Sequence, residues 1–427
     1  MGIQETLEYI HSVDWRGRKL GLERTLELLA AIGNPEKKLK FVHVAGTNGK
    51  GSTCAYIASV LQKAGYRTGL YTSPYIMRFN ERMQVDGQQI TDDELISMTD
   101  EIRPYISAME IPPSEFEIVT SIGMKYFLHK KCDIVVLEVG LGGEFDSTNV
   151  IEMPEVAVIA TIGYDHMAEL GPTLTDIAKA KAGIIKGGDV VIYGGAKEVE
   201  SVFEETCAQQ GAKLHRADFS RISDMELSLA GARFEFKPYG RMMTPLAGSH
   251  QPKNAALAMT ALEILREKGY KISDSDIIEG IAGVHWPGRF EILGQNPVFI
   301  LDGAHNPEAM EATAESLRRH FRGRKIVFVM GVMADKDVDA MICHIAPLAQ
   351  AFIAVRPDYP RAMDAKTLAG KLLLTGLPVS AFDDLAQGVA AAFRQAGESG
   401  VICALGSLYF SSDIRAAYRS NLMVKPR

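Results

Sequence analysis

Short apolar runs alternate with helix-length amphipathic stretches along most of the chain. The runs are rich in Val and Ile, as strands covered on both faces are, and the stretches between them repeat apolar positions at helical spacing. The expected strands are 40–46, 67–71, 133–139, 156–161 and 190–193, and the expected helices are 51–64, 91–106, 115–130 and 175–185. Strands that alternate with helices predict an α/β fold with a mostly parallel sheet.

The strand and helix alternation is interrupted once and then restarts. Residues 213–240 show shorter alternating segments, which predict a small antiparallel excursion. After Trp286–Pro287–Gly288, strands are expected at 298–302, 325–330, 351–355 and 401–405, and helices at 308–320, 338–348, 365–374 and 385–395. Because 427 residues exceed the size at which one core stops growing, we expect two domains, residues 1–289 and a smaller Rossmann-like α/β domain at 290–427.

Composition and charge narrow the class of protein. The chain is 47% hydrophobic and 23% charged, with a net charge of −7, which argues against a nucleic-acid-binding surface. Its five cysteines are scattered and show no zinc-site spacing, as is usual for free thiols in a reducing compartment. The first ten residues lack the apolar core of a signal sequence, and no run of 18 apolar residues follows. We therefore expect a cytoplasmic protein that binds neither nucleic acid nor a membrane.

A glycine-rich segment between an expected strand and an expected helix carries the strongest local signal. Its nucleotide-binding candidates are Thr47, Asn48, Gly49, Lys50, Gly51 and Ser52. Backbone N–H groups and the helix start favour phosphate, Lys50 is suited to the β- and γ-phosphates, and Ser52 to Mg²⁺. The segment departs from a strict Walker A motif, because Val44 stands at the first glycine position and Gly51 separates Lys50 from Ser52. A glycine-rich turn without function is the alternative.

Two further side chains follow expected strands that neighbour this loop. Glu138 ends the run DIVVLE, and His166 follows the next strand, in TIGYDHM. Ligands of doubly wound sheets bind where the carboxyl ends of strands meet, so both are candidate ligands of one or two magnesium ions. Each is also compatible with an ordinary surface or hydrogen-bonded residue.

The chain resembles the folylpolyglutamate synthase and dihydrofolate synthase family of the Mur ligase superfamily over nearly its whole length. The segments that carry the resemblance are HVAGTNGKGS, YTSPYIMRFNERMQVDGQQI, LEVGLGGEFDSTNV, GYDHMAELGPTLTDIAKAKAGIIK, HQPKNA, WPGRFE, LDGAHNP, GVMADKD and GSLYF. The resemblance implies a P-loop ATPase-type first domain and an ATP-dependent ligase. It implies that L-glutamate is joined to a folate or to dihydropteroate, through an acyl phosphate, by a monomer.

The resemblance also assigns catalytic and nucleotide contacts. Ser73 would join Glu138 and His166 in holding two Mg²⁺ ions, and Lys181 matches a lysine that the family carbamylates. The nucleotide contacts would be Asn254 to adenine, Arg289 to the phosphates and Asp302 near the ribose. Arg289 also has a physical argument, because an arginine at the domain joint closes over the γ-phosphate only when the domains meet. A solvent-facing lysine and an interdomain salt bridge are the alternatives for Lys181 and Arg289.

The contacts to the other substrates follow from the same resemblance. Arg82 lies in 79–90, which is similar to the family's flexible loop beside the folate site, and Asp146 and Thr148 lie in a loop on its other side. His305 and Ser407 match positions that face the incoming glutamate. Turn formation is the alternative for Arg82, Asp146 and Thr148. A helix-capping or buried-hydroxyl role is the alternative for His305 and Ser407.

Three positions depart from the family pattern. Glu144 replaces an arginine, Ala180 replaces a glutamate before the modified lysine, and Tyr75 replaces a histidine. These changes keep two other functions open. One is a Mur-type ligase for another carboxylate, such as a peptidoglycan precursor, and the other is a nucleotide-binding regulator without catalysis.

Overall fold

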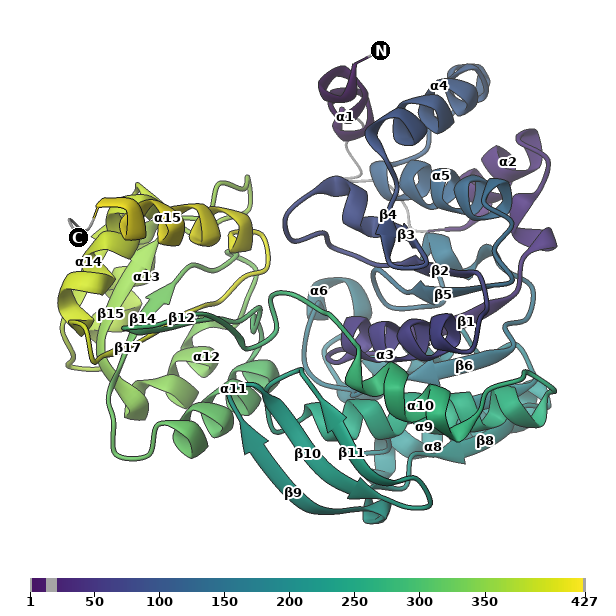
Figure 1. Ribbon diagram of the computed structural model, residues 1–427. Helices are drawn as coiled ribbons and strands as arrows, with labels where there is room; N and C mark the ends of the chain where they lie inside the picture. Colours follow the sequence, from purple (N-terminus) through teal and green to yellow (C-terminus); the bar gives the residue numbers. More distant parts are fainter. Residues whose placement is uncertain (1, 13–20, 425–427) are drawn as a thin grey trace.

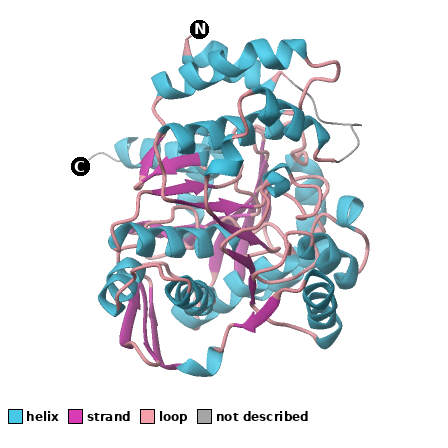
Figure 2. Ribbon diagram, turned by 90° about the vertical axis from the view of Figure 1, so that its right-hand side faces the viewer, coloured by secondary structure: helices cyan, strands magenta, loops and turns pink. Residues whose placement is uncertain are grey.

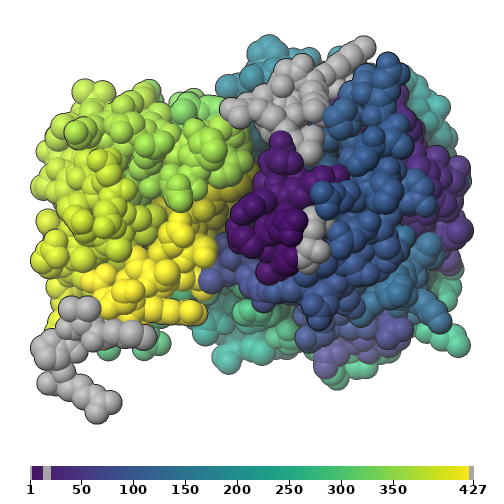
Figure 3. Space-filling model, turned by 90° about the horizontal axis from the view of Figure 1, so that it is seen from above, coloured from purple at the N-terminus to yellow at the C-terminus, as the bar shows by residue number. Residues whose placement is uncertain are grey.

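The computed structural model describes residues 2–12 and 21–424 as two α/β domains. Strands β1–β8 form one sheet, β9–β11 form a second, and β12–β17 form a third. In Figure 1 the third sheet and its helices lie to one side of the rest, and the space-filling view of Figure 3 shows the two masses side by side. The chain passes from the first domain to the second after α10 (Asp274–Ala282) and before Glu291, and a domain boundary at residue 290 stays our prediction.

The first sheet places the glycine-rich loop at its centre. Its order is β4-β3-β2-β5-β1-β6-β7-β8, and the strands from β2 to β8 run parallel. The strands are β1 (Phe41–Ala45), β2 (Thr68–Tyr71), β3 (Met83–Val85), β4 (Gln88–Gln89), β5 (Ile134–Glu138), β6 (Val156–Ile159), β7 (Asp189–Ile192) and β8 (Lys213–Arg216). Because β1 lies between β5 and β6, the loops that follow these three strands meet at one edge.

Helices cover both faces of this sheet, as Figures 1 and 2 show. One face packs against α3 (Lys50–Lys63), α9 (Gln251–Glu267) and α10. The other carries α1 (Ile3–His11), α2 (Glu23–Ala31), α4 (Asp92–Ala108), α5 (Glu115–His129), α7 (Leu174–Ala182) and α8 (Lys197–Gln210). Burial on both faces explains why β1, β2, β5 and β6 read as continuous apolar runs rather than alternating ones.

The antiparallel sheet is displaced from the predicted segment. It consists of β9 (Ile222–Ser228), β10 (Gly231–Phe236) and β11 (Gly240–Thr244). The expectation that the excursion covers 213–240 was therefore wrong at both ends. Residues 213–216 instead extend the main sheet as an edge strand, β8, parallel to β7, and this short, partly exposed segment carries no signal that separates an edge strand from a hairpin strand.

The C-terminal sheet is mixed, with the order β12-β13-β17-β14-β15-β16. Its strands are β12 (Glu291–Gln295), β13 (Val298–Leu301), β14 (Ile326–Met330), β15 (Ala349–Val355), β16 (Val379–Phe382) and β17 (Val401–Leu405). Only β12 is antiparallel to its neighbour. The helices are α11 (Pro307–His320), α12 (Val338–Ile345), α13 (Ala365–Leu373), α14 (Leu385–Ala396) and α15 (Ser411–Val424). The predicted α/β class is confirmed for both domains.

Candidate active site

The glycine-rich loop leaves β1 and enters α3 under tight steric limits. Gly46 has a φ of +147° and Gly49 a φ of +83°, values that favour glycine. A Cβ atom at Gly46 would lie 2.7 Å from Ala160 Cβ, and one at Gly49 2.8 Å from Asn254 Oδ1. Thr47 fixes the loop to the strand-end segment after β6, because its N–H donates to Thr161 O at 2.6 Å. The glycines are therefore required by the packing of the loop as well as by its backbone angles.

Two lysines point into this loop and are held by backbone carbonyls. Lys50 Nζ donates to Gly46 O at 3.0 Å and to Thr47 O at 3.1 Å, and Lys181 Nζ donates to Gly46 O at 2.9 Å. Lys181 is only 4% exposed, and burial, followed by the charge of Lys50, lowers its pKa to about 7. Within the described residues neither ammonium group pairs with a carboxylate. The loop therefore concentrates positive charge that an anionic ligand would neutralise.

Helix α9 supports the loop from the other side. Asn254 Nδ2 donates to Gln251 Oε1 at 3.2 Å, and Gln251 Nε2 donates to Ser52 Oγ at 3.3 Å. A Cβ atom at Gly51 would lie 2.9 Å from the Trp286 ring. The structure thus brings Asn254 and Ser52 to the loop as predicted, and it shows that Trp286 of the interdomain segment packs against the same turn.

Glu138 lies at the end of β5, beside the loop. Its carboxylate is 4% exposed and accepts one hydrogen bond, from Ser73 N at 3.1 Å. Burial raises the pKa of Glu138, while the charges of Lys50 and, more weakly, Arg289 lower it. Oxygen lone pairs on a buried carboxylate with one donor suit a hard cation such as Mg²⁺. The structure therefore brings Glu138 together with Ser73, Lys50 and Arg289, and their roles in binding metal and phosphate stay predictions.

Arg289 and Asp302 lie where the two domains join. Asp302 accepts from Phe290 N at 2.8 Å, from Ala304 N at 2.7 Å and from Thr313 Oγ1 at 3.1 Å, so its carboxylate ties the joint to β13. Burial lowers the pKa of Arg289, and the charges of Asp302 and Glu138 oppose this effect. Arg289 thus sits between an anion of each domain. A contact between Asp302 and the ribose of a nucleotide stays a prediction.

Asp165 connects the loop after β6 to the C-terminal domain. Its carboxylate pairs with Lys336 Nζ at 2.5 Å, with His305 Nε2 at 3.5 Å, and accepts from Asn306 Nδ2 at 3.1 Å. Burial alone would raise the pKa of Asp165, but His305, His166 and Lys336 hold it well below its ordinary value. The next residue, His166, has a left-handed backbone, and burial lowers its pKa to about 4. His166 is therefore neutral near pH 7, as a metal ligand must be.

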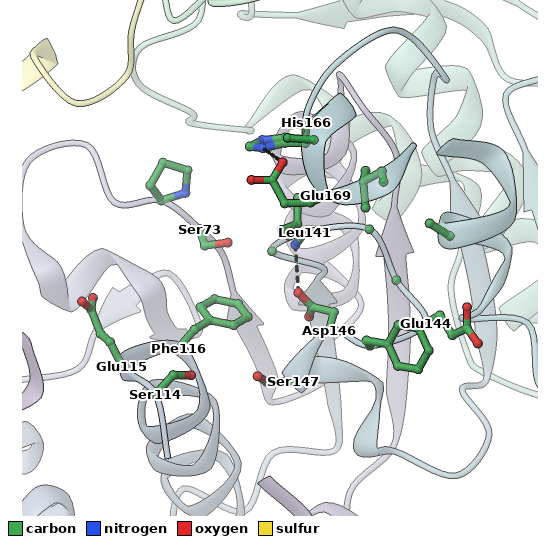
Figure 4. Close-up of a pocket in the computed structure, with 18 of the residues that line it drawn as sticks. Ser73, Ser114, Glu115, Phe116, Leu141, Glu144, Asp146, Ser147, His166 and Glu169 are labelled. Atoms are coloured by element: carbon green, nitrogen blue, oxygen red, sulfur yellow. Dashed lines mark hydrogen bonds and ion pairs between the residues drawn. The ribbon is translucent and has the colours of Figure 1, made fainter. Parts of the chain in front are cut away.

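A cavity of about 920 Å³ opens between the domains beside these groups. Figure 4 shows Ser73, Glu115, Phe116, Asp146 and His166 around it. Its walls include the predicted residues Ser73, Arg82, Asp146, His166, His305 and Ser407, and the departures Glu144 and Ala180. Both domains contribute, so the cavity can bring together groups bound to each.

The predicted substrate residues differ in how directly they face this cavity. Arg82 is largely buried, lies against the rings of Tyr75 and Phe79 at 5.3 and 5.5 Å, and approaches Glu115 at 3.9 Å. Ser407 is 2% exposed and its Oγ accepts from Tyr409 N at 3.1 Å, which agrees with the alternative of a buried hydroxyl. Asp146 lines the cavity, whereas Thr148 is fully buried behind it.

The sequence interpretation missed several residues of the site. Lys336, Tyr359, Arg361 and Tyr409 line the cavity from the C-terminal domain, and the two tyrosine rings stack with centroids 4.2 Å apart. Lys336 lies in the segment GVMADKD, whose lysine between two aspartates is a usable signal. Tyr409 lies in the segment GSLYF, near the predicted Ser407, whereas Tyr359 lies in a loop outside every segment that carries the resemblance.

The expected metal site and the expected absence of a membrane span can be compared with the described residues. Among residues 2–12 and 21–424, no three His, Cys, Asp or Glu side chains gather as a metal-binding group. The predicted set of Ser73, Glu138 and His166 holds only two such side chains and would need phosphate oxygens to complete it. No helix in the described part of the chain has the length and apolar character needed to cross a membrane.

Comparison with known proteins gives consistent matches over the whole length. The model of the Mur ligase middle domain matches residues 44–262, and that of the Mur ligase glutamate ligase domain matches residues 288–408. The dihydrofolate synthase/folylpolyglutamate synthase of Bacillus subtilis is 39% identical, over 96% of this chain and 98% of that protein.

Two solved structures share the fold. The folylpolyglutamate synthase of Mycobacterium tuberculosis, complexed with ADP and AMPPCP, superimposes with a TM-score of 0.89 at 29% identity, over 100% of both chains. E. coli FolC in complex with DHPP and ADP superimposes with a TM-score of 0.87 at 29% identity, over 99% of both chains.

Proposed function

The chain belongs to the folylpolyglutamate synthase and dihydrofolate synthase family, whose members carry the two Mur ligase domains, and from this premise we infer the reaction and the residues that perform it. It is an ATP-dependent ligase that forms an amide bond between L-glutamate and a folate. We propose that dihydropteroate is also a substrate, because the B. subtilis relative carries both names.

One observation carries the assignment of the nucleotide site. Lys50 and Lys181 both converge on Gly46 O, and each donates to backbone carbonyls rather than to carboxylates within the described residues. Lysines held at one carbonyl oxygen place positive charge at the start of α3, which favours a bound anion there. A triphosphate at the start of α3 supplies that anion. Asn254, Gly49 and Ser52 then border the nucleotide, and Arg289 approaches it from the domain joint.

The first chemical step is transfer of the γ-phosphoryl group to the substrate carboxylate. A carboxylate oxygen attacks the γ-phosphorus, the bond to the bridging oxygen breaks, and ADP leaves with that electron pair. Both reactants are anions, so Lys50 and Arg289 lower the barrier by stabilising charge in a site shielded from water. Ser73, Glu138 and His166 would hold Mg²⁺, which supplies further neutralisation of the phosphate oxygens.

The second step forms the amide. The neutral amine of glutamate attacks the acyl carbon, the C–N bond forms, the C–O bond to phosphate breaks, inorganic phosphate leaves, and the nitrogen releases one proton to the departing phosphate or to solvent. Glutamate is proposed to enter from the C-terminal side, where His305 and Ser407 line the cavity. The cavity lies between the domains, so their closure protects the acyl phosphate from hydrolysis.

Lys181 is proposed to be carbamylated. Its amine is buried, and burial lowers its pKa to about 7, so a large fraction is neutral at physiological pH. The neutral nitrogen attacks CO₂, an N–C bond forms, and one proton is released. The product is an anion beside Lys50, which relieves the repulsion between the two ammonium groups.

The cysteines and the cavity bear on the location and the oligomeric state of the protein. Four of the five cysteines, Cys54, Cys132, Cys207 and Cys403, are buried and unbridged, which suits a cytoplasmic location. The cavity is built from both domains of one chain, so a monomer suffices for catalysis.

A panel of carboxylate substrates tests the function. ADP release is measured with L-glutamate and dihydropteroate, tetrahydrofolate or a UDP-sugar peptide, and the products are weighed by mass spectrometry. We expect glutamate to be added to a folate-type substrate. ADP release with the UDP-sugar peptide alone would identify another Mur-type ligase. Nucleotide binding without turnover on any substrate would identify a regulator.

A further inference from the structure

A histidine lies in the centre of the first sheet, where every neighbour on its strand is apolar. His43 is on β1, three residues before Gly46, and is 0% exposed. Val42 and Val44 pack toward α3 and α9, while Phe41 belongs to the core of the opposite face. Because side chains alternate along a strand, His43 points to that opposite face.

The His43 imidazole ends a hydrogen-bonded chain that leads to the cavity. His43 Nε2 lies 2.9 Å from Thr148 Oγ1, and Thr148 Oγ1 lies 2.5 Å from Asp146 Oδ1. Asp146 also accepts from Thr148 N at 3.0 Å and from Leu141 N at 2.8 Å. Figure 4 shows the hydrogen bond from Leu141 N to the Asp146 carboxylate at the cavity wall. The chain thus joins a core residue to a group that faces the cavity.

The direction of the donors follows from chemistry. Burial raises the pKa of Asp146, but the backbone N–H groups of Leu141 and Thr148 donate to both of its oxygens and favour the carboxylate form. A threonine hydroxyl has one hydrogen, and a carboxylate only accepts, so Thr148 donates to Asp146. Thr148 Oγ1 must then accept from His43, which places the hydrogen of the neutral ring on Nε2. His43 Nδ1 is left as a buried lone pair, and it has no partner within the described residues. Burial lowers the pKa of His43 to about 3, so the ring stays neutral.

An apolar side chain would suit the core better than this histidine. A buried polar atom without a partner is destabilising, and the surrounding cluster would accept Leu or Phe. The ring therefore weakens the core while it supplies one donor to the Asp146 loop. Such a donor behind a binding group fixes the orientation of that group.

We infer that His43 is a positioning residue: by donating to Thr148, it fixes the Thr148 hydroxyl as a donor and so orients the Asp146 carboxylate toward the carboxylate substrate. The inference rests on the proposed function in taking Asp146 to contact that substrate. It gives Thr148 a supporting position behind Asp146 rather than a direct contact.

Matched substitutions of His43 test the steady-state consequence. His43→Phe fills the volume but removes the donor, whereas the amide of His43→Gln restores a donor near the Nε2 position. We expect His43→Phe to raise the KM for the folate substrate about tenfold, with the KM for ATP and kcat nearly unchanged. His43→Gln should recover most of this loss. Equal increases in both KM values, or no rescue by Gln, would overturn the inference.

A double-mutant cycle tests whether the effect passes through Asp146. In an Asp146→Asn background, His43→Phe should add less than twofold to the KM for the folate substrate. A full tenfold addition would show that His43 acts independently of Asp146. If the His43 variants do not fold, Thr148→Val compared with Thr148→Ser asks the same question, because only Ser keeps the hydroxyl.

The ring itself supplies a test that needs no turnover. In the full chain labelled with ¹⁵N-histidine, the His43 signal, assigned by its loss in His43→Gln, should show a neutral ring protonated on Nε2 from pH 8 to pH 5. A ring protonated on Nδ1, or one that becomes charged in this range, would refute the relay. The protonation state of His43 does not depend on which carboxylate is the substrate. Failure of this inference can therefore be distinguished from failure of the proposed function.

Discussion

Replacing Lys181 by Met should make the metal-free protein more stable while abolishing ligation. Met nearly matches the volume of the aliphatic chain but removes the buried charge and the hydrogen bond to Gly46 O. Burial, followed by the charge of Lys50, lowers the pKa of Lys181 from 10.5 to about 7. At 1.4 kcal/mol for each tenfold change in proton affinity, this difference corresponds to about 5 kcal/mol of destabilisation.

The pH dependence follows from the direction of the shift. Below about pH 7, Lys181 is charged in the folded and in the unfolded state, so the cost of its burial is fully present. Between about pH 7 and 10.5 the folded state holds fewer protons, so the stability of the wild-type protein rises with pH. The lost hydrogen bond offsets about 1 kcal/mol. The variant should therefore be more stable by on the order of 4 kcal/mol at pH 6, and the difference should shrink toward pH 9.

Urea unfolding at pH 6, 7, 8 and 9 in metal-free buffer depleted of CO₂ measures this difference. Lys179→Met is the matched control, because Lys179 lies on the same helix but is exposed. It should leave the pH dependence unchanged. A Lys181→Met protein that is less stable than wild type at pH 6, or a difference that does not vary with pH, would refute the reasoning.

Three other substitutions test separate parts of the site. Lys50→Ala should lower kcat/KM for ATP by at least 100-fold, because it removes the cation beside the transferred group; near-normal turnover would contradict the phosphate site. Glu138→Gln should raise the Mg²⁺ concentration for half-maximal activity at least tenfold, and an unchanged metal titration would remove Glu138 from the metal site. Asp165→Asn removes the nearer of the two carboxylates that pair with Lys336, at 2.5 Å against 3.8 Å for Asp335, and should cost up to about 3 kcal/mol; small-angle scattering should show a more open protein, and Asp165→Asn with Lys336→Met should reverse part of the change.

The central sheet was predictable because each local signal agreed with the others. Strands β1, β5 and β6 are buried on both faces, so their sequences are continuous apolar runs that no amphipathic helix would show. Glycine or polar residues stand at or just after the ends of these strands, where the chain leaves the sheet for a loop. That is why Gly46, Glu138 and His166 could be grouped without a structure.

The prediction of an antiparallel segment from residue 213 was wrong because edge strands and hairpin strands show the same pattern of apolar and polar residues. Both are covered on one face only, so both alternate, and nothing local shows whether the partner strand is parallel. The pairing of β8 with β7 depends on α8, which returns the chain to the sheet. Register and partner are properties of the whole domain, not of the segment.

Contacts between the domains could not be predicted from the sequence for a similar reason. Asp165 and Lys336 are 171 residues apart, and each alone is an ordinary charged residue near a turn. His43 gave no signal either, because one histidine within an apolar strand is compatible with simple packing. Both assignments needed the positions of side chains brought together by tertiary structure.

The chemistry of this domain contact suits a site that must open and close. Besides Asp165 and Lys336, Asn48 donates to Glu308 Oε2 at 2.8 Å and exchanges hydrogen bonds with Asn306 at 3.0 and 3.2 Å. When the domains separate, water can replace the hydrogen bonds of these polar groups, so the net free energy of breaking them is small. Asn48 belongs to the glycine-rich loop, so a displacement of this loop would act directly on Asn306 and Glu308 of the C-terminal domain.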